Sequence, residues 1–179
     1  MTRMRLQLAV LVTLSILLLG CQGGDNMEAV KDLDLDRFMG DWHVIANIPT
    51  FIEKNTTNNL ESYSLRDDGN VDITFTVTTE AGERKSYSAT GFVLDQNQPS
   101  RWKVQFFWPV KFPFYVIELD EEYSYTVIGL PNRKYVWVMA REPQMDPVIY
   151  QDILARLSDI GYNVDDIQKV TIDPEIIRG

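Results

Sequence analysis

The one cysteine of this 179-residue chain, Cys21, directly follows an uncharged, mostly apolar run from Leu6 to Leu19 and a glycine. Arg3 and Arg5 precede that run, so the N-terminus has the positive, then apolar, then small-residue order of an export signal. The run of about 14 residues is shorter than the roughly 20 that a membrane-spanning helix needs. The sequence therefore predicts a signal peptide that is removed, and it excludes an intrachain disulfide.

The segment Leu18-Leu19-Gly20-Cys21 resembles the lipobox of bacterial lipoproteins. In that family the peptide is cut before the cysteine, which then carries the lipid. Gln22, in a position where Asp favours retention in the inner membrane, implies the outer membrane, at its periplasmic face. The alternative is a soluble exported protein with a chance cysteine. The resemblance implies three segments: a signal peptide over 1–20, a lipidated tether over 21–30 and a folded domain over 31–179.

Other residue types that do chemistry are sparse. The sole histidine, His43, falls within a predicted strand, and no Gly-x-Ser-x-Gly nucleophile motif occurs. The acid pairs Asp67-Asp68 and Asp165-Asp166 fall in predicted turns, where they are solvated. No His/Cys cluster has the spacing of metal ligands. We expect no enzyme, no metal and no cofactor, with a carboxylate-pair hydrolase as a formal alternative.

The charge of the chain is −9, and removal of a signal that holds two arginines and no acid makes the remainder more negative. Nucleic-acid binding depends on Lys and Arg that neutralise phosphates, so this class is excluded. Attachment to anionic lipid through a basic patch is excluded for the same reason. Membrane attachment is therefore expected to come from acyl chains on Cys21.

Beyond residue 40 the chain consists of short segments in which apolar and polar residues alternate, and turn residues separate these segments. This is the pattern of an antiparallel meander. Eight such strands leave two unpaired edges unless the sheet closes. We expect an all-β, eight-stranded up-and-down barrel, and a two-layer sandwich is the competing architecture. Residues 109–113, bracketed by prolines, are expected to form a loop. The predicted strands cover 41–48, 60–66, 71–79, 84–94, 101–108, 114–119, 123–130 and 134–141.

Two helical segments flank this meander. Asp146 is a suitable N-cap and Pro147 a suitable first residue for a helix that ends near Gly161. A stripe of Ile149, Ile153, Leu157 and Ile160 is expected to pack this helix outside the sheet. A short helical turn with Leu33, Leu35 and Phe38 is expected to plug one end of the barrel, and residues 167–172 could add a last short strand.

The chain resembles the lipocalins. Gly40-Asp41-Trp42 matches their Gly-x-Trp motif, and Asp120, Tyr123 and Arg141 match a turn and a late arginine. The runs over 63–69, 116–123 and 135–143 are similar to bacterial lipocalins of an apolipoprotein-D-like branch. The resemblance implies a calyx that binds fatty acids or lysophospholipids, with Arg141 packed over Trp42 at its closed end. His43 departs from the tyrosine usual after the motif tryptophan.

Alternation along the strands nominates an apolar and aromatic inward set. A cavity and a filled core both fit this set. Glu61 and Glu118 share the inward parity, where one could tune headgroup preference near the mouth, or a register shift could turn it outward. The residues expected to contact ligand are Tyr63, Ile73, Phe75, Val77, Trp102, Val104, Phe106, Val116, Tyr125, Tyr135, Trp137 and Met139; Val44, Ala46, Ala89, Gly91, Val93 and Val127 are also expected to face inward.

Two functions follow from these expectations. The first is an outer-membrane-anchored lipocalin that binds and stores or transports lipid in the cell envelope. The alternative is a structural envelope lipoprotein with a filled barrel whose surface binds another protein. The lipid, the choice between storage and transport, and a homodimer are left open by the sequence.

Overall fold

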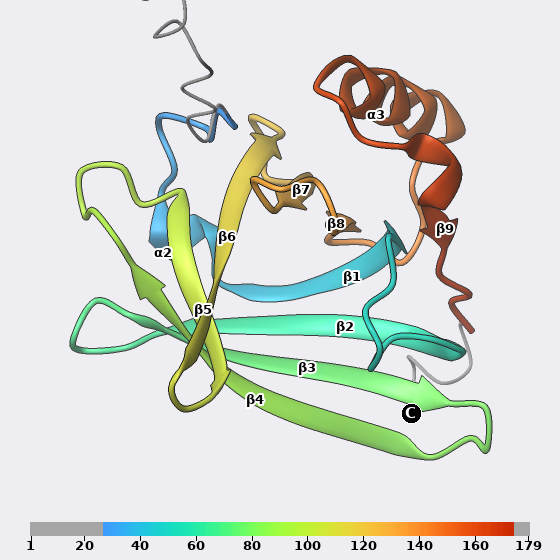
Figure 1. Cartoon of the computed structure of the whole chain (residues 1–179), viewed down its shortest axis with the longest axis horizontal. Helices are drawn as coiled ribbons and strands as arrows, with labels where there is room; N and C mark the ends of the chain where they lie inside the picture. Colours follow the sequence, from blue (N-terminus) through green and yellow to red (C-terminus); the bar gives the residue numbers. More distant parts are fainter. Residues whose placement is uncertain (1–26, 174–179) are drawn as a thin grey trace, which may run out of the picture.

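The protein was analysed as a computed structural model that describes residues 27–173. The predicted signal peptide, Cys21 and Gln22 lie outside the described residues. Within them, nine antiparallel strands form one sheet in the order β2-β3-β4-β5-β6-β7-β8-β1-β9, and β1 also pairs with β2. That pairing closes eight strands into a barrel with one helix outside it (Figure 1). The predicted barrel is confirmed and the sandwich is excluded.

The elements follow one another with mostly short connections. The strands are β1 (Gly40–Asn47), β2 (Thr56–Leu65), β3 (Val71–Thr79), β4 (Arg84–Val93), β5 (Arg101–Phe107), β6 (Val110–Leu119), β7 (Tyr125–Gly129), β8 (Val136–Ala140) and β9 (Gln168–Lys169). The helices are α2 (Leu35–Phe38), α3 (Pro147–Asp159) and the 3-10 turn η1 (Val164–Asp166).

Two strands begin several residues earlier than predicted. β2 begins at Thr56 instead of residue 60, and β6 begins at Val110, so the predicted loop over 109–113 is wrong. Pro113 lies inside β6, opposite Lys103 of β5. A proline lacks an N–H, but a strand accepts it where the sheet places no ladder hydrogen bond on that nitrogen. The β5–β6 connection is therefore a tight hairpin around Trp108 and Pro109.

The barrel wall buries a separate cluster on each of its two faces. The interior cluster contains Trp42, Trp102 and Phe114, and the helix-side cluster contains Val138, Ile153 and others between the wall and α3. β-Strands place alternate residues on opposite faces, so one strand contributes to both clusters. In β8, for example, Val136 and Val138 belong to the helix-side cluster, whereas Trp137 and Met139 lie in or against the interior cluster.

Helix α3 has the predicted start, because the Asp146 carboxylate accepts a hydrogen bond of 2.7 Å from the Val148 N–H. Its buried stripe differs from the prediction. Tyr150, Ile153 and Leu157 are buried, whereas Ile149 and Ile160 are exposed. The helix is rotated toward Tyr150, whose large ring offers more apolar area to the sheet.

The chain before α2 packs on the barrel. Met27 is buried in the helix-side cluster, and the Val30 N–H donates to the Val116 carbonyl at 2.9 Å. The Ser100 hydroxyl donates to the Val30 carbonyl, and the Arg101 guanidinium donates to the Met27 carbonyl. The packed domain thus includes the last four residues of the predicted tether.

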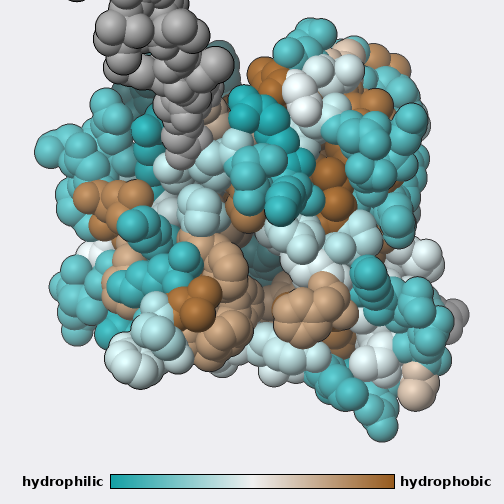
Figure 2. Space-filling view, viewed as in Figure 1, coloured by the Kyte–Doolittle hydropathy of each residue, from teal (hydrophilic) through white to brown (hydrophobic). Residues whose placement is uncertain are grey.

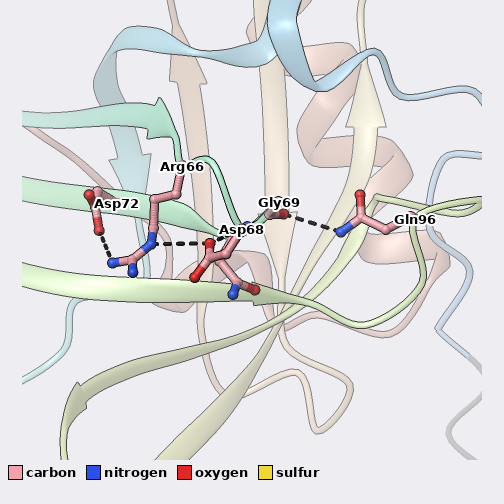
Figure 3. A network of polar contacts seen from close by, with 6 residues as sticks. Arg66, Asp68, Gly69, Asp72 and Gln96 are labelled. Carbon is pink, nitrogen blue, oxygen red and sulfur yellow. Dashed lines mark hydrogen bonds and ion pairs between the residues drawn. The ribbon is translucent and has the colours of Figure 1, made fainter.

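A polar network fixes the β2–β3 hairpin (Figure 3). Arg66 forms ion pairs with Asp68 at 3.2 Å and with Asp72 at 3.0 Å, and Gln96 donates to the Gly69 carbonyl at 3.2 Å. The Asn70 N–H and then Arg66 hold the pKa of the Asp68 carboxyl below its usual value. Gly69 has a φ of +77°, which glycine adopts without strain. These contacts tie the hairpin to the loop that precedes β5.

Candidate functional site

The closed end of the barrel is sealed by Arg141 over Trp42. The guanidinium carbon lies 3.7 Å from the centroid of the Trp42 ring, which is a favourable cation–π distance. Arg141 also donates to three carbonyls, those of Asp41 at 2.9 Å, Arg37 at 2.8 Å and Phe38 at 3.1 Å. This is the contact that the family resemblance implied. Burial lowers the pKa of the Arg141 guanidinium.

Helix α2 plugs the same end, as expected. Phe38 is fully buried, and its carbonyl accepts a hydrogen bond of 2.9 Å from the Trp42 indole. Tyr123 has a positive φ of 59° in the turn that follows Asp120, and its hydroxyl accepts from the Asp34 N–H at 2.9 Å. The Ser124 hydroxyl donates to the Asp120 carboxylate and keeps the pKa of Asp120 low. The motif residues thus build one floor.

Above this floor, aromatic rings form a continuous series through the interior. Phe38 lies edge-on to Trp102 at 5.7 Å between centroids, and Trp102 stacks on Phe114 at 5.5 Å. Phe114 continues to Trp137 at 6.3 Å, which in turn stacks on Tyr135 at 6.2 Å. These separations are within the range at which aromatic pairs attract. The interior wall is therefore apolar, rigid and aromatic over much of its length.

The β1–β2 connection is fastened by the buried Glu53. Its carboxylate accepts from the Trp137 indole and the Asn47 amide, both at 2.7 Å. It also accepts from the Thr50 N–H at 2.9 Å and the Thr50 hydroxyl at 2.6 Å. Four donors from three residues satisfy this carboxylate, as a buried charge requires. The connection is thereby held against the interior aromatic series at the end opposite Trp42.

Glu61 lies inside the barrel, directly across from Trp42 of the closed end. It is 6% exposed, it lies across from Phe75 of β3, and it accepts a hydrogen bond from the Tyr63 hydroxyl. Burial raises the pKa of Glu61 to about 7, an effect that the Tyr63 hydrogen bond opposes and the charge of Glu53 reinforces. Burial likewise raises the pKa of the Tyr63 hydroxyl.

Most residues predicted to contact ligand lie in or against the interior cluster. Tyr135, just before β8, stacks on Trp137, and Phe106 lies 41% exposed near the tip of the β5–β6 hairpin. The predicted residues that line the interior are Tyr63, Ile73, Phe75, Val77, Trp102, Val104, Val116, Trp137 and Met139. Their role in ligand binding stays a prediction.

Three inward assignments are wrong, because Tyr125, Val127 and Ala46 pack in or against the helix-side cluster. For Glu118 the outward alternative is confirmed, since it binds Arg156 of α3 at 2.5 Å and 3.1 Å. The pairing register shifts between Val44 and Ala46 and between Val116 and Glu118. Such a bulge reverses which face each following residue takes. In β7 both faces are apolar, because α3 covers the outer one, so alternation could not tell them apart.

Sequence reasoning missed Phe114, Ile128 and Glu53. Phe114 shares the strand parity of Val116, so that signal was available. Ile128 is fully buried in the interior and alternates with Val127, which was chosen instead. Nothing in the sequence of a polar connection marks Glu53 as a buried carboxylate.

A hollow of about 620 Å³ lies on the outer face of the barrel, between β2–β4 and the β5–β6 hairpin. Figure 2 shows apolar side chains gathered over this hairpin, where Trp108 is 85% exposed and Phe107 is 59% exposed. Ile73 and Ala89 of the interior cluster also border the hollow, but most of its wall is made of the polar residues that alternate with that cluster. The hollow therefore lies on the outer side of these strands. The polar residues of its wall are Ser64, Asp72, Thr74, Ser88, Thr90 and Gln105.

Among residues 27–173 no group of three His, Cys, Asp or Glu side chains is arranged to hold a metal ion. None of the helices described is both long and apolar enough to cross a bilayer. His43 is half-buried in β1, opposite Leu60 and Ala140, and burial lowers its pKa.

Residues 33–172 match the family described as "Lipocalin-like domain". The chain is a lipocalin. It is 29% identical over 153 residues to temperature-induced lipocalin-1 of Arabidopsis thaliana, with 80% of this chain and 82% of that protein covered. It is 28% identical over 156 residues to the outer membrane lipoprotein Blc of Vibrio cholerae, with 86% and 91% covered.

Solved structures agree on the fold. Insecticyanin from the tobacco hornworm Manduca sexta superposes with a TM-score of 0.67 at 14% identity, covering 84% of this lipocalin and 86% of that chain. The resemblance to bacterial lipocalins and apolipoprotein D is confirmed, since Blc and apolipoprotein D of Bos taurus are both relatives. Lipocalins in general bind or transport small hydrophobic ligands, and aliphatic and aromatic side chains line the interior of this lipocalin.

Proposed function

We propose that this lipocalin binds fatty acids or lysophospholipids in its interior and stores or transports them in the cell envelope. The observation that carries the proposal is the aromatic and aliphatic interior of a barrel that Trp42 and Arg141 close at one end. Each methylene moved from water to such a wall contributes about 0.8 kcal/mol, so a long acyl chain needs few polar contacts. The ligand enters at the end fastened by Glu53.

Outer-membrane attachment through Cys21 is part of the same proposal. The lipobox-like sequence supports it, and so does the similarity to relatives named outer membrane lipoprotein. We propose the periplasmic face of the outer membrane as the site of action, with binding and not catalysis as the activity.

Ligand binding is tested with the chain from Gln22 onward, which retains every described residue. Co-purified lipid is identified by mass spectrometry after solvent extraction, and a fluorescent fatty acid is titrated in. Saturation near one probe per chain is expected. The variant Ala89→Leu adds bulk to the interior and should weaken binding by about tenfold or more, since overfilling a packed wall costs about 1–3 kcal/mol.

Ser88→Leu is the matched control, because Ser88 is exposed beside the buried Ala89 in β4. It should leave the affinity unchanged. Loss of binding in Ser88→Leu but not in Ala89→Leu would indicate that the ligand binds on the outer face of the barrel. If the parent chain carries no co-purified lipid and does not bind the fluorescent fatty acid, the alternative of a structural lipoprotein with a filled barrel is favoured.

Anchoring is tested in the full chain. Cys21→Ser should abolish incorporation of a clickable palmitate analogue and release the protein from the membrane fraction. Gln22→Asp should keep the lipid but shift the protein to inner-membrane fractions in a density gradient. Membrane retention of Cys21→Ser would contradict the proposed anchor.

A further inference from the structure

The hairpin that joins β5 and β6 exposes a cluster of large apolar side chains. Of the eleven large apolar side chains exposed among residues 27–173, five lie within seven consecutive residues around the turn at Trp108 and Pro109. A contiguous exposed apolar patch on a soluble domain marks an interaction surface. We call these five residues the hairpin patch; they are Phe106, Phe107, Trp108, Val110 and Phe112.

The hairpin patch lies at the end of a projecting element. In the described sheet β4 pairs with β5 only from Val93 opposite Trp102 to Thr90 opposite Gln105. The hairpin therefore continues beyond Gln105 without β4 beside it. In Figure 1 its loop extends past β4 and away from the rest of the barrel. Such a tip can enter another phase without any rearrangement of the barrel wall.

Positive charge lies behind this apolar tip. The chain has a net charge of −9, yet residues 96–117 contain no aspartate or glutamate and include Arg101, Lys103 and Lys111. The Lys111 ammonium lies 3.2 Å from the centroid of the Phe92 ring, and Lys103 is exposed on β5. An apolar tip followed by cations matches the surface of a bilayer, where hydrocarbon is followed by phosphates.

The size of the hairpin patch does not fit a second copy of the chain. A fully exposed aromatic ring presents at most about 250 Å², so the five side chains together expose about 600 Å² at most. A standard protein interface buries about 800 Å² on each partner. A bilayer has no such minimum area, because each apolar side chain that inserts contributes separately.

The chain that precedes the described residues also favours a membrane. The Arg101 guanidinium donates to the Met27 carbonyl at 3.3 Å, so the described chain begins beside the first residue of β5. The seven residues from Arg101 to Trp108 span about 23 Å along an extended strand. The chain from Met27 back to Cys21 reaches about 22 Å at most. With this segment extended, or with the barrel tilted, Cys21 and Trp108 reach the same bilayer surface.

We propose that the hairpin patch inserts into the leaflet that holds Cys21, with Phe107 and Trp108 at the edge of the hydrocarbon and Lys111 among the phosphates. Aromatic side chains favour this depth, because they have a large apolar surface and tolerate the polar interface. The hairpin thereby holds the barrel against the bilayer. This inference goes beyond the proposed function, and only the choice of leaflet rests on the proposed anchor at Cys21.

Vesicle binding tests the insertion without the anchor. The chain from Gln22 onward, which lacks Cys21, is floated with vesicles of phosphatidylcholine and phosphatidylglycerol in equal parts. The parent chain should float with the vesicles. Phe107→Ser combined with Trp108→Ser should lower the partition coefficient at least about tenfold, because two rings no longer leave water.

The matched control removes two exposed apolar side chains elsewhere. Val148→Ser combined with Ile149→Ser lies on α3, and it should leave the partition coefficient unchanged. Lys111→Gln should lower it about fivefold on these vesicles, and should leave it unchanged on pure phosphatidylcholine.

Quenching by brominated acyl chains locates the inserted ring without a loss of binding. Vesicles that carry such chains should quench part of the tryptophan fluorescence of the parent chain. In Trp108→Phe the vesicle binding should remain, because the ring is replaced by another, and that part of the quenching should disappear. The remaining signal comes from Trp42, Trp102 and Trp137 of the barrel.

The outcomes separate this inference from the proposed function. A parent chain that does not float, equal losses in the hairpin and α3 variants, or quenching that persists in Trp108→Phe overturns the insertion. A parent dimer in sedimentation velocity that Trp108→Ser dissociates, without vesicle binding, overturns it in favour of a second copy. A fluorescent fatty acid that fails to bind the parent chain overturns the proposed function and leaves the insertion intact.

Discussion

The two clusters on opposite faces of the barrel wall differ in what they bury. The helix-side cluster is made of residues such as Val127, Val138 and Ile153, and the ion pair of Glu118 with Arg156 lies at its partly exposed edge. The interior cluster surrounds Glu61, a carboxyl that has no cationic partner among residues 27–173. A surface needed only for packing excludes charge, whereas the interior retains one at a cost in stability. We take that difference as the mark of a surface that serves a ligand.

The largest effect is expected at the floor of the interior. Trp42→Ala should lower the free energy of unfolding by about 3–5 kcal/mol, because it leaves a cavity and removes the ring under Arg141. Urea denaturation followed by circular dichroism measures the loss. Trp108→Ala is the control, because an 85% exposed ring should contribute within about 0.5 kcal/mol. Similar losses for both would mean that Trp42 does not seal the barrel.

The next effect concerns the charge of Glu61 and depends on pH. The folded pKa of about 7 exceeds the ordinary value of 4.5, so the folded state binds the proton more tightly than the unfolded state. Stability should therefore fall as the pH rises from about 4.5 to about 7, by about 3 kcal/mol in total, and level off above that. Glu61→Gln should lack this component. The quantity to measure is the difference in unfolding free energy between parent and variant across pH 4.5 to 8, where a constant difference would refute the assignment.

A matched pair of small deletions sharpens the comparison between the two faces. Ile73→Val in the interior and Ile153→Val in α3 should each cost about 1 kcal/mol of stability, since each removes one buried methylene. Only Ile73→Val should weaken binding of an uncharged alkyl probe, by about two- to fourfold. Thermal melting and probe titration on the same samples give both numbers. An equal loss of affinity in Ile153→Val would mean that the faces are not functionally distinct.

The smallest effect is expected at the edge of the helix-side cluster. Glu118→Gln should cost about 0.5 kcal/mol, because Arg156 is about half exposed and water screens the pair. That cost should vanish in about 1 M salt. A loss of several kcal/mol would show that this ion pair holds α3 on the barrel. The helix-side cluster would then depend on charged groups, contrary to the comparison made above.

The order of the strands and helices and the residues of the closed end could be predicted from the sequence. Alternation gave the strands, the Asp146-Pro147 pair gave the start of α3, and the family motif gave the Arg141–Trp42 contact. These features depend on local periodicity, capping chemistry and a motif, and each of these signals comes from residues that are close together in the sequence. The plug that ends in Phe38 could be predicted for the same reason.

The inner surface of the site was harder to predict, because a strand's face depends on register. The bulges near Ala46 and Glu118 carry no sequence signature, yet each reverses the face taken by the later residues of its strand. Tyr125 was misplaced because α3 makes both faces of β7 apolar. The buried Glu53 depends on donors brought together only by the closed barrel, so no local pattern could have revealed it.

If Cys21 carries acyl chains, as proposed, the burial of Met27 limits the distance between the barrel and the membrane. Only five residues separate Cys21 from Met27. Because an extended chain spans at most about 3.6 Å per residue, the distance from Cys21 to the buried Met27 cannot exceed about 22 Å. With acyl chains on Cys21, the barrel would stay within a few nanometres of the membrane leaflet that holds those chains. Cargo would then be exchanged with the bilayer beside it, and crossing the envelope would require a second, mobile carrier.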